Sequence, residues 1–85
     1  MKFNKLKNAE ATLNDVVIEL YSNRRLLVFD CKGVIDYNDD SIILDLGERK
    51  LKIMGKGLVV DSFVFDQTDI RGSITSLEFM GGNND

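Results

Sequence analysis

The amino-acid sequence predicts an all-β fold: a small antiparallel meander of about seven or eight short strands, closed into a sandwich or a barrel. Apolar residues alternate with polar ones, which is typical of strands with one buried face. Valine and isoleucine are frequent in these runs, and helical spacing is not sustained anywhere. The positions expected to face the core are Val16, Ile18 and Leu20, then Leu27 and Phe29, then Ile42, Leu44 and Leu46, and finally Leu51 and Ile53.

Turn-forming residues separate these runs at intervals of about eight to twelve residues, as expected for short strands joined by short connections. The sequence contains no proline, so no run is restricted to a sheet edge on that ground. The expected turns, in chain order, are Ser22-Asn23-Arg24, Lys32-Gly33, Asn38-Asp39-Asp40, Gly47-Glu48, Gly55-Lys56-Gly57 and Asp66-Gln67-Thr68.

The alternation slips by one residue at two places, which predicts β-bulges at Asp61-Ser62 and at Thr75-Ser76. Bulges bend a strand, and such bends let a small sheet fold over itself. Gly55 and Gly72 lie between strand-like residues, where a positive φ or a close backbone approach would require glycine.

A short β-solenoid is the alternative architecture. Glycine followed by alternating apolar residues recurs loosely, and a parallel solenoid also has short strands with glycine corners. The spacing of this repeat is irregular, which favours the antiparallel prediction. The glycines concerned are Gly33, Gly47, Gly55, Gly57 and Gly72.

Length and composition predict a single folded domain. The chain has 85 residues, of which 44% are hydrophobic and 29% charged, within the range of globular proteins. We expect a polar arm over residues 1–15, one β domain over residues 16–80 and a disordered polar tail over residues 81–85.

Charge, cysteine content and hydropathy favour a cytoplasmic protein. The net charge of −3 gives no general attraction to nucleic acid. Cys31 is the only cysteine, which excludes an internal disulfide and suits a reducing compartment. No segment has the apolar run of a signal peptide or a transmembrane helix. Cys31 itself follows Phe29 at strand spacing, so we expect it to be a small buried residue rather than a nucleophile.

Oxygen-bearing side chains crowd together only in the stretch DYNDDS, residues 36–41, where Asp36, Asn38 and Asp40 have the spacing of the first ligands of a calcium loop. Such a loop needs glycine at its sixth position and glutamate at its twelfth, which are Ser41 and Gly47 here. It also needs flanking helices, whereas strand-like sequence surrounds this stretch. A turn explains the same residues, because asparagine and aspartate side chains bond nearby backbone amides. We therefore predict a turn and no metal site.

The sequence offers no catalytic or cofactor-binding group, and we expect a protein that is not an enzyme. It contains no histidine, so no Ser-His or Cys-His pair can form. Asp36, Asp45 and Asp61 are candidates for a carboxylate pair only by default. The segment Gly55-Lys56-Gly57 lacks the spacing of a phosphate-binding loop and precedes no helix.

A second class of function is a small ligand- or nucleic-acid-binding barrel. Arg24 and Arg25 would form a basic patch with the lysines if their strands were neighbours. Phe63, Phe65 and Phe79 have the alternation of core residues, so we do not expect them to act as stacking platforms. The lysines concerned are Lys50, Lys52 and Lys56.

Three segments within residues 33–79 resemble the YabP/YqfC family of sporulation proteins from endospore-forming Firmicutes. The first holds Gly33 and Tyr37, the second is LKIMG (residues 51–55) followed by Leu58 and Val60, and the third is IRGSITSLEF (residues 70–79). These match the family pattern of a strand ending in glycine, a Leu-x-Val strand and a terminal Ile-x-Gly-x-Ile-x-Ser-Leu-x-Phe strand.

This resemblance implies a non-enzymatic protein of the mother-cell cytoplasm, acting in spore envelope or coat assembly and without catalytic residues. It also implies a protein partner, such as a membrane-embedded sporulation protein that would hold the chain at a membrane. From the residues themselves we expect an interaction or assembly module, because an open strand edge can add a strand from a partner or from a second copy of the chain.

Overall fold

The computed structural model describes residues 16–81, and these form one six-stranded sheet with no helix. Every pair of neighbouring strands is antiparallel, and the order across the sheet is β1-β2-β6-β5-β4-β3. The all-β prediction is confirmed, and the parallel solenoid is excluded. The expected arm and nearly all of the expected tail lie outside the described residues. The strands are β1 Ile18–Tyr21, β2 Arg25–Val28, β3 Gly33–Tyr37, β4 Ser41–Asp45, β5 Lys50–Val64 and β6 Gln67–Met80.

The expected count of seven or eight strands is wrong for this part of the chain, which has six. The error lies at the glycines. The segment Gly55-Lys56-Gly57 does not end a strand as predicted, because β5 passes through it. Gly72 lies inside β6, between strand residues as predicted. Glycine in a strand interior often marks a bend rather than a turn, and both strands bend here.

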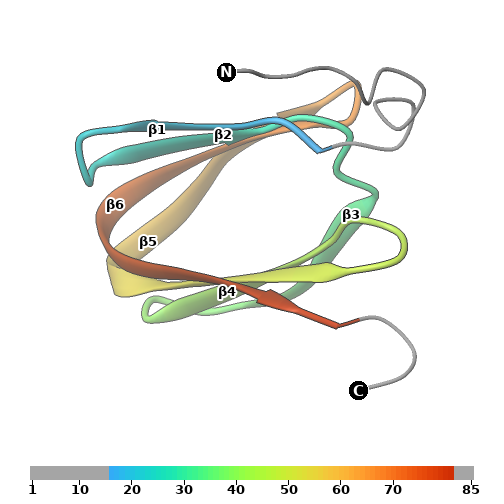
Figure 1. Cartoon of the computed structure of the whole chain (residues 1–85). Helices are drawn as coiled ribbons and strands as arrows, with labels where there is room; N and C mark the ends of the chain where they lie inside the picture. Colours follow the sequence, from blue (N-terminus) through green and yellow to red (C-terminus); the bar gives the residue numbers. More distant parts are fainter. Residues whose placement is uncertain (1–15, 82–85) are drawn as a thin grey trace, which may run out of the picture.

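Figure 1 shows how these bends fold the sheet over into two layers. The first layer contains β1 and β2, together with residues 67–71 of β6 and residues 59–64 of β5. The second layer contains β3 and β4, together with residues 50–54 of β5 and residues 74–80 of β6. The sheet remains open, with β1 and β3 at its two ends.

Gly72 and Gly55 allow the two long strands to cross the bend together. Gly72 has a φ of +139°, and a Cβ atom there would lie 2.8 Å from the Gly57 carbonyl oxygen. At Gly55 the dihedral is ordinary, but a Cβ atom would collide with the Ser73 carbonyl oxygen. Gly72 is therefore required both by its positive φ and by the nearby backbone, and Gly55 is required by the nearby backbone alone.

Both predicted bulges are present. The register between β5 and β6 passes from Met54 opposite Ser76 to Gly55 opposite Ile74, which leaves Thr75 as the extra residue. Asp61 is the extra residue of the second bulge. A third irregularity in this pair lies at the bend itself, where Gly57 and Leu58 face Gly72.

Two hairpin loops secure the bend through backbone hydrogen bonds. In the β1–β2 loop, the carbonyl oxygens of Asn23 and Arg24 accept from the N–H groups of Ile74 and Gly72. In the β3–β4 loop, the carbonyl oxygens of Asp39 and Asp40 accept from Leu58 and Gly55. These bonds give partners to backbone N–H groups of β5 and β6 that would otherwise be unpaired at the bend.

The core lies between the two layers. The predicted inward positions of β4 and the start of β5 are confirmed, whereas the phase predicted for β2 is wrong. Leu26 and Val28 are fully buried in the core, while Leu27 and Phe29 alternate with them and lie on the opposite face. Leu27 is nevertheless buried, at 8% exposure, and Phe29 is partly buried. Leu20, also expected to be buried, is 48% exposed because it lies on the end strand β1. The buried cluster consists of Leu26, Val28, Cys31, Ile42, Leu44, Leu46, Leu51, Ile53, Leu58, Ile70 and Ile74.

Candidate interaction surface

The outer face of the first layer carries rows of side chains that run across four strands. Because Leu26, Val28 and Ile70 point into the core, their neighbours along β2 and β6 point outwards. The register places Tyr21 beside Arg25, Arg25 beside Arg71, and Arg71 beside Val59. The next row holds Glu19, Leu27, Asp69 and Ser62, and the row after it holds Val17 and Phe29.

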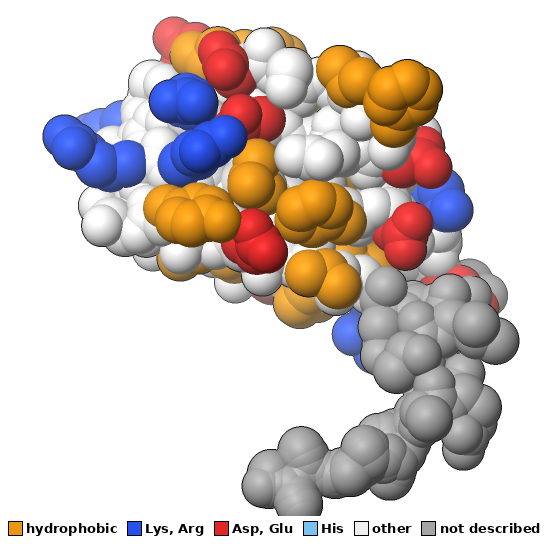
Figure 2. Space-filling model, turned by 90° about the horizontal axis from the view of Figure 1, so that it is seen from above, with side chains coloured by type: hydrophobic (Ala, Val, Ile, Leu, Met, Phe, Trp, Pro, Cys, Tyr) orange, Lys and Arg blue, Asp and Glu red, His pale blue; other side chains and the backbone are white. Residues whose placement is uncertain are grey.

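We call this surface the arginine face. Figure 2 views the molecule from this side and shows hydrophobic side chains interleaved with acidic ones, with basic side chains gathered at one end. The outer face of a sheet is ordinarily polar, so this mixture of aromatic, aliphatic and arginine side chains is unusual. The arginine face comprises Val17, Glu19, Tyr21, Arg25, Leu27, Phe29, Val59, Asp61, Asp69 and Arg71, with Arg24 in the adjoining loop.

Asp69 holds the two arginines of this face in position. The Arg25 guanidinium donates through Nε to Asp69 Oδ1 at 3.3 Å and through Nη2 to Oδ2 at 3.1 Å. Arg71 Nη2 lies 3.8 Å from the same Oδ2, and Arg71 Nε lies 3.4 Å from Asp61 Oδ2. Two like charges directly opposite one another destabilise a strand pair, and Asp69 in the next row offsets that repulsion.

Burial differs sharply within this cluster. The side chain of Asp69 is only 10% exposed, whereas the side chains of Arg25 and Arg71 are 40% and 52% exposed. The hydrogen bonds that Arg25 donates to Asp69 raise the pKa of Arg25 above its usual value. The carboxylate is thus covered, while both guanidinium groups remain accessible in a defined position.

Tyr21 extends the cluster as an ordered aromatic side chain. The Arg25 Cζ atom lies 5.7 Å from the centre of the Tyr21 ring, within the range of a cation–π contact. The Tyr21 hydroxyl donates to Glu19 Oε1 at 2.7 Å. That hydrogen bond to a carboxylate raises the pKa of Tyr21 above its usual value of 10.0. About half of the tyrosine surface stays exposed.

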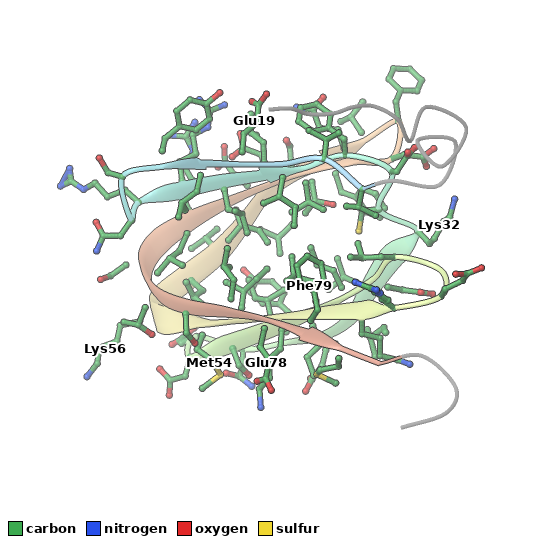
Figure 3. All side chains as sticks on the ribbon, in the orientation of Figure 1. Glu19, Lys32, Met54, Lys56, Glu78 and Phe79 are labelled. Atoms are coloured by element: carbon green, nitrogen blue, oxygen red, sulfur yellow. The ribbon has the colours of Figure 1, made fainter. Side chains whose placement is uncertain are left out.

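The outer face of the second layer is an ordinary solvated surface by comparison. One row places Asp36, Ile43, Lys52 and Glu78 side by side, so that opposite charges face one another. The side chains of Met54 and Glu78 point away from the core on this side, as Figure 3 shows. Lys50 and Lys52 lie on this layer, and Lys56 lies at the bend. The basic patch expected from Arg24, Arg25 and the lysines does not form, because Arg25 lies on the first layer and Lys50 and Lys52 lie on the second.

The stretch DYNDDS forms the end of β3 and the β3–β4 loop. Asn38 Oδ1 accepts hydrogen bonds from the N–H groups of Asp40 at 2.8 Å and Ser41 at 3.0 Å, which is the geometry of an Asx turn. Asp36 Oδ1 accepts from the N–H of Tyr37. Within residues 16–81, no group of three or more acidic, cysteine or histidine side chains is arranged to hold a metal ion.

The other residues singled out from the sequence lie apart. Asp36 and Asp45 belong to β3 and β4 of the second layer, while Asp61 belongs to the bulge of the first layer. Asp45 Oδ1 accepts from the Gly47 N–H in the following turn. Cys31 is fully buried, as predicted, with its thiol 3.4 Å from the Gly33 carbonyl oxygen.

Three phenylalanines expected to be core residues are exposed instead. Phe63, Phe65 and Phe79 are 43%, 96% and 51% exposed. Phe63 and Phe79 lie where β5 and β6 have a neighbour on one side only, and Phe65 occupies the β5–β6 turn. Arg49 Cζ lies 5.9 Å from the centre of the Phe79 ring, which Figure 3 shows between the two layers.

Sequence reasoning missed the arginine face, although a signal for it exists. Residues 26–29, LLVF, form a continuous apolar run rather than an alternating one. Such a run indicates a strand with apolar side chains on both faces. Since one face lies on the core, the apolar residues of the other face, Leu27 and Phe29, lie among the side chains of the outer surface.

No helix in the described part of the chain is long and apolar enough to cross a membrane. Comparison with known proteins gives one match. The model of the YabP family matches residues 12–85, which includes all six strands. No curated protein and no solved structure matches the chain. The family match covers most of the chain and agrees with the resemblance carried by the segments around Tyr37, Gly55 and Gly72. This chain therefore belongs to the YabP family, and with it to the sporulation-related proteins.

Proposed function

We propose that this chain is a non-enzymatic interaction or assembly module in endospore envelope or coat formation, and that the arginine face is its docking surface for a protein partner. Membership of the YabP family supports the setting in sporulation. The proposed site of action is the cytoplasm of the mother cell, where a membrane-embedded partner would hold the chain at a membrane.

The observation that carries this proposal is the composition and order of the arginine face. Tyrosine and arginine are enriched at the energetically dominant positions of protein interfaces, and charged lysine and glutamate are depleted there. Tyr21 and Arg25 are stacked, and Arg25 is held by two hydrogen bonds to Asp69. Side chains already fixed in position lose less conformational entropy on binding, so such a surface suits a partner.

The proposal also accounts for the apolar residues on this face. Val17 and Val59 are the exposed aliphatic residues of this face, Phe29 is partly buried, and Leu27 is only 8% exposed. Apolar side chains mixed with polar and charged ones are typical of the interfaces of non-obligate complexes. On the outer face of the second layer Lys52 faces Glu78, and the described residues there include no ordered arginine and aromatic pair.

Spore yield tests this proposal. In an endospore-forming host that depends on this chain, we expect Tyr21→Ala and Arg24→Glu to reduce the number of heat-resistant spores. Arg24 and Tyr21 are exposed, so neither change removes a core contact. Lys56→Glu is the matched control, because it reverses an exposed charge that points away from the arginine face. A normal spore yield from both face variants, at normal protein levels, would contradict the proposal.

A further inference from the structure

The β5–β6 hairpin ends in an apolar residue where the backbone favours a small polar one. Phe65 and Asp66 are the two central residues of this turn, with φ values of 52° and 67°. Positive φ at both positions is the geometry of a type I′ turn, which prefers Asn-Gly. A bulky residue with positive φ is uncommon. Phe65 is also 96% exposed, so almost no packing within the described chain compensates for its conformation.

The surroundings of Phe65 are apolar and acidic. Phe63 and Val64, the two residues of β5 that precede Phe65, are also exposed apolar residues. The Cys31 N–H donates to the Asp66 carbonyl oxygen at 2.9 Å, which brings the loop that carries Asp30 beside the turn. Asp30 and Asp66 are both exposed. We call residues 63–66 the hairpin tip: an apolar projection bordered by two carboxylates, which an anionic lipid surface would repel.

The opposite end of the same layer carries positive charges and an aromatic ring, which complement the carboxylates and the phenylalanine of the hairpin tip. Arg24, Arg25 and Arg71 gather there beside the exposed ring of Tyr21, and Figure 2 shows the basic side chains at that end. Arg24 is exposed and forms no ion pair within residues 16–81. The β1–β2 loop and the β5–β6 turn lie at opposite ends of the layer in Figure 1.

We propose that the hairpin tip of one copy of this chain docks on the Tyr21 and Arg24 end of the arginine face of a second copy. The Phe65 ring would pack on the Tyr21 ring and its stacked guanidinium, and the carboxylate of Asp66 would approach Arg24. This inference rests on the proposed function, because it names the occupant of the same docking surface. The two surfaces differ and lie at opposite ends, so the contact is heterologous and repeats from copy to copy unless the rotation closes a ring.

Sedimentation velocity of the purified full chain across a wide concentration range tests this inference. We expect the weight-average mass of the wild type to rise with concentration. Phe65→Asn removes the ring and places a preferred residue in the turn, so it should fold at least as well and lose the rise in mass. Arg24→Glu should also lose it, and Lys56→Glu should retain it. Phe65→Leu keeps an apolar side chain and should retain part of the association.

Mixing the two defective variants gives the sharpest result. Phe65→Asn retains an intact arginine face, and Arg24→Glu retains an intact tip. A heterologous contact therefore predicts a one-to-one complex of the two variants that grows no further, although each variant alone is a monomer. A different fluorescent label on each variant identifies that complex.

Several outcomes would overturn the inference. A wild type that stays monomeric at every concentration, association that survives Phe65→Asn, or the absence of a mixed complex would each do so. Binding to phosphatidylcholine or phosphatidylglycerol vesicles that depends on Phe65 would also overturn it and make the tip a lipid anchor. A monomeric wild type together with a sporulation defect in Arg24→Glu would leave the proposed function standing. Normal sporulation of both Tyr21→Ala and an Arg24→Glu variant that no longer associates would refute the proposed function instead.

Discussion

Gly72 is the residue at which the two long strands change layer. It combines a positive φ of 139° with contact distances too short for any side chain. A β-branched residue would suffer both penalties at once, since it avoids positive φ and would collide with the backbone at Gly57 and Leu58.

We therefore expect Gly72→Val to lower the free energy of unfolding by about 1–3 kcal/mol or more, as strained backbone positions do. Gly33→Ala is the matched control, because a Cβ atom at Gly33 would meet no atom within 4 Å. Its effect should stay within about 0.5 kcal/mol. Urea denaturation measures both, and equal stability of the two variants would remove the argument from strain.

Asp69 gives a second test at the scale of single residues. Asp69→Asn removes the charge that offsets the repulsion between Arg25 and Arg71, and we expect a loss of about 1–3 kcal/mol in unfolding free energy. Asp61→Asn removes a carboxylate whose side chain is half exposed and should cost less than about 1 kcal/mol. Thermal unfolding of the two variants compares them. A smaller loss for Asp69→Asn than for Asp61→Asn would show that burial of Asp69 does not matter.

The hydroxyl of Tyr21 reports on the order of the arginine face. Because Glu19 raises its pKa, we expect Glu19→Gln to lower the Tyr21 pKa towards 10.0. Because the Tyr21 pKa is higher in the folded chain than in the unfolded chain, the hydrogen bond stabilises the fold at pH values below the unfolded-state pKa. This stabilisation is lost as the pH rises through the folded-state pKa. Titration of the Tyr21 ring resonances by NMR in the wild type and in Glu19→Gln measures this. An unchanged Tyr21 pKa would show that the bond to Glu19 does not form in solution.

At the scale of elements, a single side chain links the open edges of β3 and β5. The Val60 N–H donates to the Tyr37 hydroxyl oxygen at 3.1 Å, although the two strands are not neighbours in the sheet. This bond joins the second layer to the first on one side of the core. It also gives a physical role to the tyrosine on which part of the family resemblance rests.

Tyr37→Phe should therefore loosen the contact between the layers. We expect a loss of about 0.5–1.5 kcal/mol and faster hydrogen exchange at the Val60 amide, because that donor loses its acceptor. Tyr21→Phe removes a hydroxyl from the other tyrosine and should leave the Val60 amide unchanged. Equal exchange rates at Val60 in the two variants would contradict this role.

The elements differ in how far the sequence predicts them. In β4 and the start of β5, apolar and polar residues alternate, so Ile42, Leu44, Leu51 and Ile53 could be placed in the core. In β2, residues 26–29 are all apolar, and alternation alone cannot say which of them point inwards. The sequence predicts a turn at Gly55-Lys56-Gly57, where β5 in fact continues, because a bend within a long strand and a turn between short ones use the same residue. The prediction for Gly72, a positive φ or a close backbone approach between strand residues, is confirmed.

The candidate surface was less predictable for a related reason. The ladder that brings Tyr21, Arg25, Arg71 and Val59 into one row depends on β2 pairing with β6, which is far from it in the chain. Local patterns do not specify such non-local pairing. The exposure of Phe65 was also hidden, because a phenylalanine in a turn is a local exception to turn preferences, and such exceptions tend to occur at functional positions.

At the scale of the whole molecule, one sheet presents two outer faces of different character. The first carries ordered arginine and aromatic side chains around a covered carboxylate, and the second carries charges that alternate in sign. The bend at Gly55 and Gly72 produces both faces from a single sheet and leaves the first layer with its hairpin tip at one end and its arginines at the other.

Site-specific photo-crosslinking in sporulating cells tests most directly whether the arginine face is the docking surface. A photoreactive phenylalanine analogue at position 21 lies on the arginine face, and the same analogue at position 78 lies on the outer face of the second layer. We predict a discrete crosslinked product from position 21 and none from position 78, with a product of twice the chain mass if a second copy occupies the face. Crosslinking from position 78 alone, or equally from both positions, would contradict the account.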